Sequence, residues 1–194
     1  MRIEAIVATH IHADHLSGER ELAARTGAPI YLHESAEVGY PFTGLSDGSE
    51  ISLGNVALRA LHTPGHTPES VSLLVTDRSR GEAPWMVLTG DTLFVGDVGR
   101  PDFGGPEAAR TLYDSIQRKL LSLPDYIEVY PAHISGSPCG RTMSGKPSST
   151  IGFERRFNQA IQTKSPDEFV ANLFEGLPPK PPAYYKVIEA NRGR

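Results

Sequence analysis

The chain has 194 residues, of which 39% are apolar and 22% charged, and this composition excludes a disordered chain, a collagen-like repeat and a coiled coil. We expect one domain over residues 1–194. The net charge is −4 and no basic block could follow a phosphate backbone, so nucleic acid is not an expected partner. Without a membrane-length apolar run or a secretory signal, we expect a cytoplasmic protein with no membrane partner, and the single Cys139 agrees with a reducing compartment.

The first half of the chain alternates short apolar runs with turn-forming residues. Residues 3–9 predict a strand, and polar, histidine-rich sequence begins directly after it. Ser17 is predicted as the N-cap of a helix over residues 18–26, which Gly27 ends. The next strand is predicted over residues 28–32, and residues 51–53 and 56–61 are predicted to pair as a hairpin. Two more strands are predicted over residues 70–76 and 85–89.

The second half contains the clearest helix. Apolar residues at a spacing of four predict a helix over residues 106–121, with Pro106 in its first turn. A strand is predicted over 127–130, followed by a loop to about Ser149. Residues 165–168 form a capping box that begins a helix ending near Phe174, and the proline-rich tail after it is predicted to be extended.

A cluster of metal-binding residue types follows the first predicted strand. Residues 10–15 read His-Ile-His-Ala-Asp-His. Imidazole suits zinc, iron and other first-row ions, and a carboxylate adds a harder ligand and a compensating charge. One such histidine is more often structural than a ligand, but the set together predicts a metal site, whereas His33 and His62 lie outside it and are predicted to be structural. Three more donors lie in similar short motifs, His66 in Pro-Gly-His-Thr, Asp91 after Thr-Gly and His133 in Tyr-Pro-Ala-His.

These motifs carry a resemblance to a known family. In this order, His-x-His-x-Asp-His, Pro-Gly-His-Thr, Thr-Gly-Asp-Thr and Tyr-Pro-Ala-His closely resemble the metallo-β-lactamase superfamily. The resemblance implies an α/β fold, an αββα sandwich that gathers these loops at one edge. Residues 90–102 and 133–140 look like the persulfide dioxygenases of that superfamily, in particular the metallo-β-lactamase portion of those fused to rhodanese domains.

The resemblance implies two ways of using the donors. In the zinc hydrolases, one metal is held by the positions of His10, His12 and His66, a second by Asp14, His15 and His133, and Asp91 is shared. The dioxygenase resemblance implies instead one Fe(II) per chain, held by His10, His66 and Asp91. Two histidines and one carboxylate leave positions open for substrate sulfur and dioxygen. We expect Asp14 and His133 to lie outside this set and to fix the tautomers of the ligand imidazoles.

The implied reaction oxidises a low-molecular-weight persulfide, such as glutathione persulfide, with dioxygen and water to sulfite and the parent thiol. Arg100 is predicted to bind a substrate carboxylate, and the alternative is a structural ion pair with Asp102. Cys139 is predicted either to carry or receive a sulfane sulfur, or to be an unreactive buried thiol.

Only nine residues precede His10, whereas members of the family carry further strands there, so we expect an N-terminally shortened sandwich. Its first sheet would leave an edge open, which favours a homodimer. We expect no rhodanese domain after Arg194. The expected partners are therefore the persulfide, dioxygen and a separate rhodanese-type sulfurtransferase.

Two other functions fit the same residues. A dinuclear zinc hydrolase of the glyoxalase II type would use a metal-bound hydroxide, and all seven of its ligands are present. However, we expect no counterpart after residue 174 of the helical domain that glyoxalase II adds for glutathione. A non-catalytic protein that binds metal or persulfide is the second alternative, which stoichiometric binding without sulfite release would reveal.

Overall fold

The computed structural model describes residues 2–101, 103–163, 165–177 and 179–194. The helices in these ranges are α1 (Glu19–Thr26), α2 (Gly105–Ser115) with a π-helical continuation (Ile116–Leu120), α3 (Ile151–Phe157), α4 (Pro166–Phe174) and α5 (Tyr184–Asn191). The strands are β1 (Ile6–Val7), β2 (Ile30–His33), β3 (Thr43–Leu45), β4 (Glu50–Leu53), β5 (Val56–His62), β6 (Val71–Asp77), β7 (Met86–Gly90), β8 (Leu93–Phe94), β9 (Asp97–Val98), β10 (Glu128–Pro131) and β11 (Ser149–Thr150).

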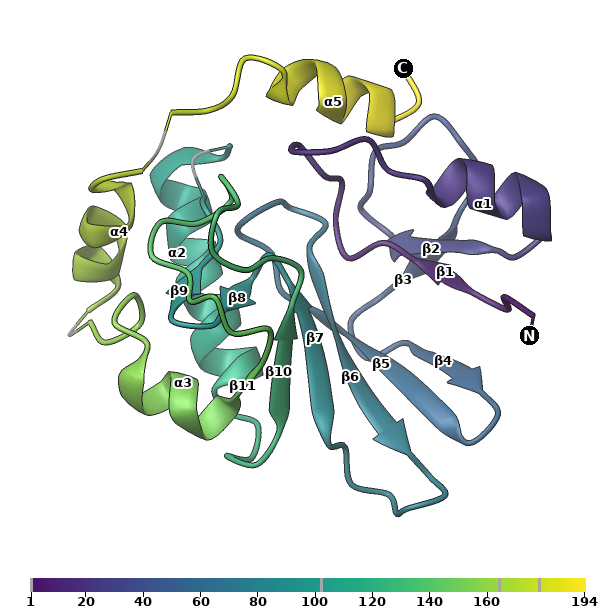
Figure 1. Ribbon diagram of the computed structural model, residues 1–194, viewed down its shortest axis with the longest axis horizontal. Helices are drawn as coiled ribbons and strands as arrows, with labels where there is room; N and C mark the ends of the chain where they lie inside the picture. Colours follow the sequence, from purple (N-terminus) through teal and green to yellow (C-terminus); the bar gives the residue numbers. More distant parts are fainter. Residues whose placement is uncertain (1, 102, 164, 178) are drawn as a thin grey trace.

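Two sheets form the middle of the molecule (Figure 1). The larger sheet has the strand order β11-β10-β7-β6-β5-β4, and the smaller one is parallel with the order β1-β2-β3. Helix α1 lies beside the smaller sheet, while α2, α3 and α4 lie on the opposite side of the larger one (Figure 1). The layers therefore run helix, sheet, sheet, helix, which confirms the predicted αββα sandwich.

Strand β6 shows how the larger sheet is buried on both faces. Residues 71–75 are all buried. Leu74 packs in a cluster with helix α2, whereas Val71 and Leu73 pack in a second cluster against the smaller sheet. Successive side chains of a strand point to opposite faces, so a continuous apolar run suits a strand between two layers.

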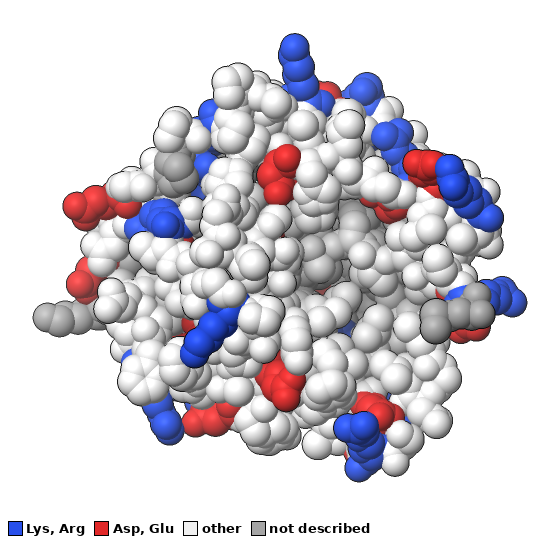
Figure 2. Space-filling model, viewed as in Figure 1, with Lys and Arg blue, Asp and Glu red and all other residues white. Residues whose placement is uncertain are grey.

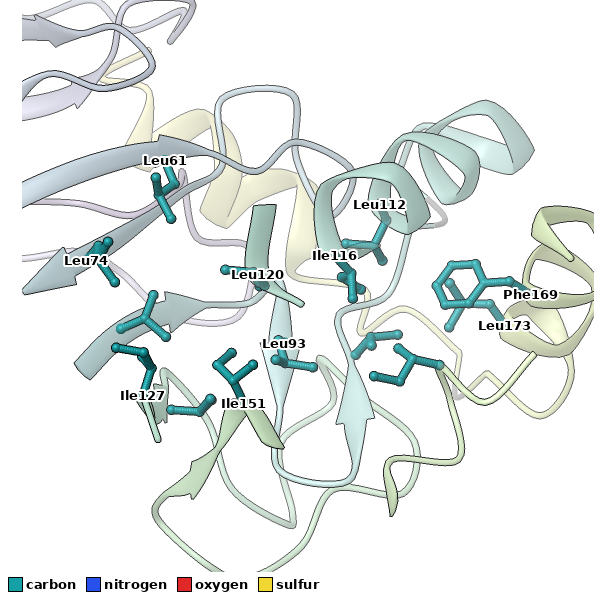
Figure 3. Packing of buried hydrophobic residues seen from close by; sticks show 14 of the residues in the cluster. Leu61, Leu74, Leu93, Leu112, Ile116, Leu120, Ile127, Ile151, Phe169 and Leu173 are labelled. Atoms are coloured by element: carbon teal, nitrogen blue, oxygen red, sulfur yellow. The ribbon is translucent and has the colours of Figure 1, made fainter. Parts of the chain in front are cut away.

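The core between the larger sheet and the helices fixes helix α2 (Figure 3). Leu112, Ile116 and Leu120, spaced four residues apart, are fully buried and meet Phe169 and Leu173 of α4 in one cluster. Full burial of such a side chain contributes roughly 1.5–3 kcal/mol. Helix α2 is thus a rigid support for any loop that packs on it.

Several predicted elements are confirmed, with boundaries that differ by one or two residues. The hairpin forms from β4 and β5, with Leu53 opposite Val56. Helix α2 begins one residue before Pro106. Ser165 caps α4, because its side chain accepts a hydrogen bond from the backbone N–H of Glu168 at 3.2 Å.

Two predictions near the N-terminus are wrong in detail. The strand expected over residues 3–9 is limited to Ile6–Val7, because the Thr9 carbonyl accepts a hydrogen bond from Val71 and the chain crosses toward the larger sheet there. Gly18, not Ser17, is the N-cap of α1. The Ser17 backbone N–H instead donates to Asn191 at 2.9 Å, so this residue is used in a long-range contact.

The tail is also corrected. It was expected to be extended, but residues 184–191 form helix α5, whose Tyr184 and Asn191 are buried. Strands β3, β8, β9 and β11 and helix α3 have no counterpart among the predicted elements. No helix in the described ranges combines the length and the apolar character needed to cross a membrane.

Acidic and basic side chains are interspersed on the face shown in Figure 2. Neither sign forms a continuous stripe there, and uncharged residues cover most of its centre. This face therefore offers no extended region of one charge.

Candidate metal centre

Four loops meet at one edge of the sheets. Strands β7 and β10 are parallel, and β5 runs in the direction of β7 because both are antiparallel to β6. Asp91 follows β7, His133 follows β10, His66 follows β5, and residues 10–15 follow β1. These strand ends lie in the upper part of Figure 1, below α5. Because neighbouring strands end at the same edge, side chains far apart in sequence meet there.

Two glycines allow the loops to approach closely. Gly65 has φ +139°, and an added Cβ would lie 2.4 Å from the Cα of Leu112, so the loop before His66 lies flat on α2. Gly90 has φ +52°, and an added Cβ would lie 2.8 Å from the Oγ1 of Thr9. The contact at Gly65 fixes the loop of His66 against α2, and the contact at Gly90 fixes the loop of Asp91 against the residue before His10.

His10, His66 and Asp91 form what we call the buried triad. Each is 2% exposed. The Nε2 atoms of His10 and His66 lie 3.8 and 3.5 Å from the Oδ2 of Asp91. One ligand atom from each residue lies within 4.8 Å of the others, so the three could hold one metal ion.

The Nδ1 atoms of both triad histidines have partners. His66 Nδ1 lies 2.8 Å from the backbone carbonyl oxygen of Arg100, which only accepts, so Nδ1 carries a proton and Nε2 is the nitrogen that faces the site as a possible ligand atom. His10 Nδ1 lies 3.0 Å from the hydroxyl of Thr9. Burial lowers the pKa of His10 well below its ordinary value, which favours the neutral imidazole that binds metal. The Arg100 carbonyl thus sets the tautomer of His66, while the Thr9 hydroxyl, which can donate or accept, contacts His10 at Nδ1; Asp14 and His133, the expected partners, occupy neither position.

Asp91 is the buried group whose surroundings indicate a cation. Burial raises the pKa of its carboxyl, but the nearby His10, His133 and His66 outweigh burial and lower the pKa well below the ordinary value. Neither carboxylate oxygen has a hydrogen-bond partner among the described residues. A buried, ionised carboxylate that faces three imidazoles but accepts no hydrogen bond among the described residues is costly in a protein interior, and a metal ion held by it and the two Nε2 atoms would compensate the charge. The residues therefore fit a metal.

His12, Asp14 and His15 form a second group, the outer cluster. The Oδ1 of Asp14 lies 3.8 Å from the Nδ1 of His12 and 3.1 Å from the Nδ1 of His15. The His15 side chain is 52% exposed, in contrast to the buried triad. Burial, followed by the neighbouring His15, lowers the pKa of His12. This cluster could hold a second ion, although closer to solvent.

His133 lies between the two groups. Its Nε2 is 3.4 Å from the Oδ2 of Asp14 and 3.4 Å from the Oδ2 of Asp91. Burial lowers the pKa of His133, but Asp91 and the thiol of Cys139 outweigh it and raise the pKa to about 10. Ligand atoms of Asp14, His133 and Cys139 also lie within 4.8 Å of one another. All seven predicted donors therefore come together at this edge.

The two predicted substrate contacts are both buried. Cys139 is 2% exposed beside Phe94 and Met143, and burial raises the pKa of its thiol. Arg100 is 1% exposed, donates to the carbonyl of Pro138 at 2.9 Å and lies over the ring of Tyr184 at 5.8 Å. The alternative partner of Arg100, Asp102, lies outside the described residues. Contact of either residue with substrate stays a prediction.

His33 and His62, which were predicted to be structural, stack with a centroid distance of 3.7 Å. His62 also bonds through Nε2 to the carbonyl of Pro68, in the loop that carries His66.

A cavity of about 600 Å³ lies beside the buried triad. Residues 64–69, the first turns of α2 and helix α5 line it, and His66 is on its wall. Phe103, another wall residue, meets the His66 ring edge to face at 5.8 Å. A cavity of this size suits a small-molecule ligand.

Two polar residues at this edge were not among the predicted site residues. Glu69, 5% exposed, accepts a hydrogen bond from the backbone N–H of Ile11 at 2.9 Å. The sequence could have indicated Glu69, because this carboxylate lies between the proline- and glycine-rich residues 64–68 and the apolar strand that begins at Val71. Asn191, 2% exposed, contacts residues 12–17 across more than 170 positions, a separation that no local pattern reveals.

Comparison with known proteins gives a consistent result. The chain is 34% identical to a probable metallo-hydrolase of Burkholderia pseudomallei, over 88% of this chain and 64% of that protein. It is 33% identical to the mitochondrial persulfide dioxygenase ETHE1 of Bos taurus, over 98% of this chain and 69% of that protein. The crystal structure of ETHE1 from Myxococcus xanthus superimposes with a TM-score of 0.83 at 32% identity, covering 99% of this chain and 77% of that one.

The chain thus spans about two thirds of the length of these curated relatives, 64% and 69%. The family model of the metallo-β-lactamase superfamily matches residues 1–133, which include the buried triad, the outer cluster and His133. With the layered fold and the convergent donors, this match establishes that the chain belongs to the metallo-β-lactamase superfamily and has persulfide dioxygenases among its relatives.

Proposed function

We propose that this protein is an Fe(II)-dependent persulfide dioxygenase that acts on a low-molecular-weight thiol persulfide such as glutathione persulfide. The observation that carries the proposal is the buried triad of two histidines and one carboxylate that accepts no hydrogen bond among the described residues. This donor set is typical of non-haem iron oxygenases. The similarity to ETHE1 proteins over nearly the whole chain supports the same reaction.

The reaction consumes one persulfide, one dioxygen and one water, and it yields one thiol, one sulfite and two protons. The terminal sulfur is oxidised and dioxygen is reduced. Iron bound by His10, His66 and Asp91 would supply the redox chemistry. The protein must bind the persulfide next to the triad, keep the triad histidines neutral and limit access of bulk water.

The chain has groups for each of these tasks. The carbonyl of Arg100 fixes the proton of His66 on Nδ1, and the deep burial of the triad excludes bulk water. His133 holds a proton at Nε2, between Asp14 and Asp91. The cavity beside His66 has room for the carrier thiol, and in this proposal Arg100 orients a substrate carboxylate while Cys139 lies near the reacting sulfur.

The test is metal analysis of protein purified without oxygen, combined with oxygen uptake and sulfite release on glutathione persulfide. We expect one iron per chain and one sulfite per oxygen consumed. Persulfides of coenzyme A and other thiols, assayed in parallel, identify the carrier. Iron-loaded protein without persulfide-dependent oxygen uptake would contradict the proposal.

A dinuclear zinc hydrolase is the second candidate function. The observation in its favour is the outer cluster, which with His133 provides donors for a second ion next to Asp91. The relative named as a probable metallo-hydrolase is consistent with it. Two zinc ions per chain together with thioester cleavage would select this function over the first.

A further inference from the structure

The segment of residues 10–17, which we call the histidine loop, contains no helix or strand. It carries three histidines and one aspartate of the candidate site. In such a segment the buried backbone N–H and C=O groups lack the regular hydrogen bonds of a helix or a sheet, so other groups, side chains included, must supply hydrogen-bond partners. The residues that do so determine the conformation of the loop.

The first half of the histidine loop is held from the start of β6 and from the loop before it. Ile11 donates its backbone N–H to the buried carboxylate of Glu69 at 2.9 Å. Just before the loop, the Thr9 carbonyl accepts a hydrogen bond from the N–H of Val71. These contacts fix the part of the chain that carries His10.

The second half is held by one side chain from the opposite end of the sequence. The Nδ2 of Asn191 donates to the carbonyls of His12 and His15 at 2.8 and 2.9 Å. Its Oδ1 accepts the N–H of Ser17 at 2.9 Å. Both amide protons are used, so the orientation of the amide is fixed, and the three bonds enclose the segment from His12 to Ser17.

The helix that carries Asn191 is anchored independently of this contact. Arg20 donates to the carbonyl of Ala190 at 2.8 Å, and the N–H of Gly39 donates to the carbonyl of Arg192 at 2.7 Å. Asn191 therefore lies on a helix whose position is fixed by other contacts, and the histidine loop takes its conformation from the hydrogen bonds to Asn191.

We propose that Asn191 is a positioning residue that holds the outer cluster in its metal-binding arrangement. It fixes the backbone on both sides of Asp14, whose carboxylate faces His12, His15 and His133. Without the amide, two carbonyls at the site lose their donors and the loop has to rearrange to find others. The inference rests on the outer cluster as the position of a second ion, the one that the second candidate function uses, and not on the reaction performed at the site.

The experiment compares Asn191→Asp, Asn191→Ala and a control, Lys186→Ala, at an exposed position of the same helix. Asn191→Asp keeps the size of the side chain and the acceptor for Ser17, but it removes the donor to His12 and His15. The probes are Zn²⁺, with affinity measured by chelator competition, and Co²⁺, whose visible absorption bands report the geometry of its ligands.

We expect both Asn191 variants to bind the second Zn²⁺ ion, the one at the outer cluster, about tenfold or more weakly than the wild type and to shift the Co²⁺ bands of that ion, because partners of ligating groups commonly contribute this much. Lys186→Ala should match the wild type. Wild-type affinity and an unchanged Co²⁺ spectrum in Asn191→Asp would overturn the proposal.

Hydrogen exchange on the unmutated protein gives a test that does not depend on the variants folding. The amide of Ser17 should exchange slowly, and rapid exchange there also overturns the proposal. Failure of the wild type to oxidise persulfides would instead refute the proposed function and leave these binding results valid.

Discussion

The buried triad and the outer cluster use the same residue types but are held in different ways. The triad is almost fully enclosed, and its histidines are oriented by Thr9 and by the carbonyl of Arg100. The outer cluster reaches solvent through His15, and Asn191 holds its backbone from the last helix. Packing of the core thus prepares the triad, whereas one long-range contact prepares the outer cluster. Variants of the two groups should therefore differ in metal affinity and in stability.

The largest effect is expected from Asp91→Asn. The change keeps the shape but removes the only negative charge in the buried triad, so metal affinity should fall on the order of a hundredfold or more. Chelator competition with Zn²⁺ measures this loss, and Glu82→Gln at an exposed position is the control. Unchanged affinity in Asp91→Asn would remove the triad as the primary metal site.

Gly65→Ala tests whether the core prepares the triad. The new methyl group would overlap the backbone of Leu112, and φ +139° is strained for alanine, so we expect a loss of about 3 kcal/mol in the free energy of unfolding. Gly54→Ala, at a turn with φ +61° and open space around it, should cost only about 1 kcal/mol. Urea unfolding measures both, and equal costs would show that the loop does not depend on contact with α2.

The pH dependence of stability should report the triad more than the outer cluster. Burial lowers the pKa of His10, so below about pH 6.5 the unfolded chain binds a proton that the folded one does not. The metal-free protein should therefore lose stability as the pH falls from about 7 to 5. His10→Gln should flatten this dependence more than His15→Gln, which acts only through the pKa of the neighbouring His12, and equal slopes in urea unfolding of the two variants would contradict the assignment.

The smallest effect is expected from His15→Ala. The side chain is half exposed and at the rim of the outer cluster, so affinity for the first metal ion should stay within about threefold of the wild type. Zinc titration measures this. A loss as large as that of Asp91→Asn would mean that the outer cluster, not the buried triad, binds the first ion.

The sequence was sufficient for elements with a local cause. The spacing of Leu112, Ile116 and Leu120 predicts α2 because a helix repeats every 3.6 residues. Ser165 and Pro166 predict the start of α4 through a cap. The donors could be named because each lies in a short motif.

The remaining features depend on contacts between distant parts of the chain. Helix α5 was missed because the prolines before it suggest an extended tail, although prolines also suit the residues just before a helix. The spacing of Tyr184, Ile188 and Asn191 on one side of that helix was the available signal. Nothing local to Asn191 or Ser17 could show that they meet.

Titration of Fe(II) into metal-free protein without oxygen, followed by sulfite release from glutathione persulfide, tests the central claim most directly. Sulfite production should rise linearly and saturate at one iron per chain, and it should be absent in Asp91→Asn. Persulfide turnover that needs no iron, or thioester cleavage that saturates at two zinc ions per chain, would contradict the claim.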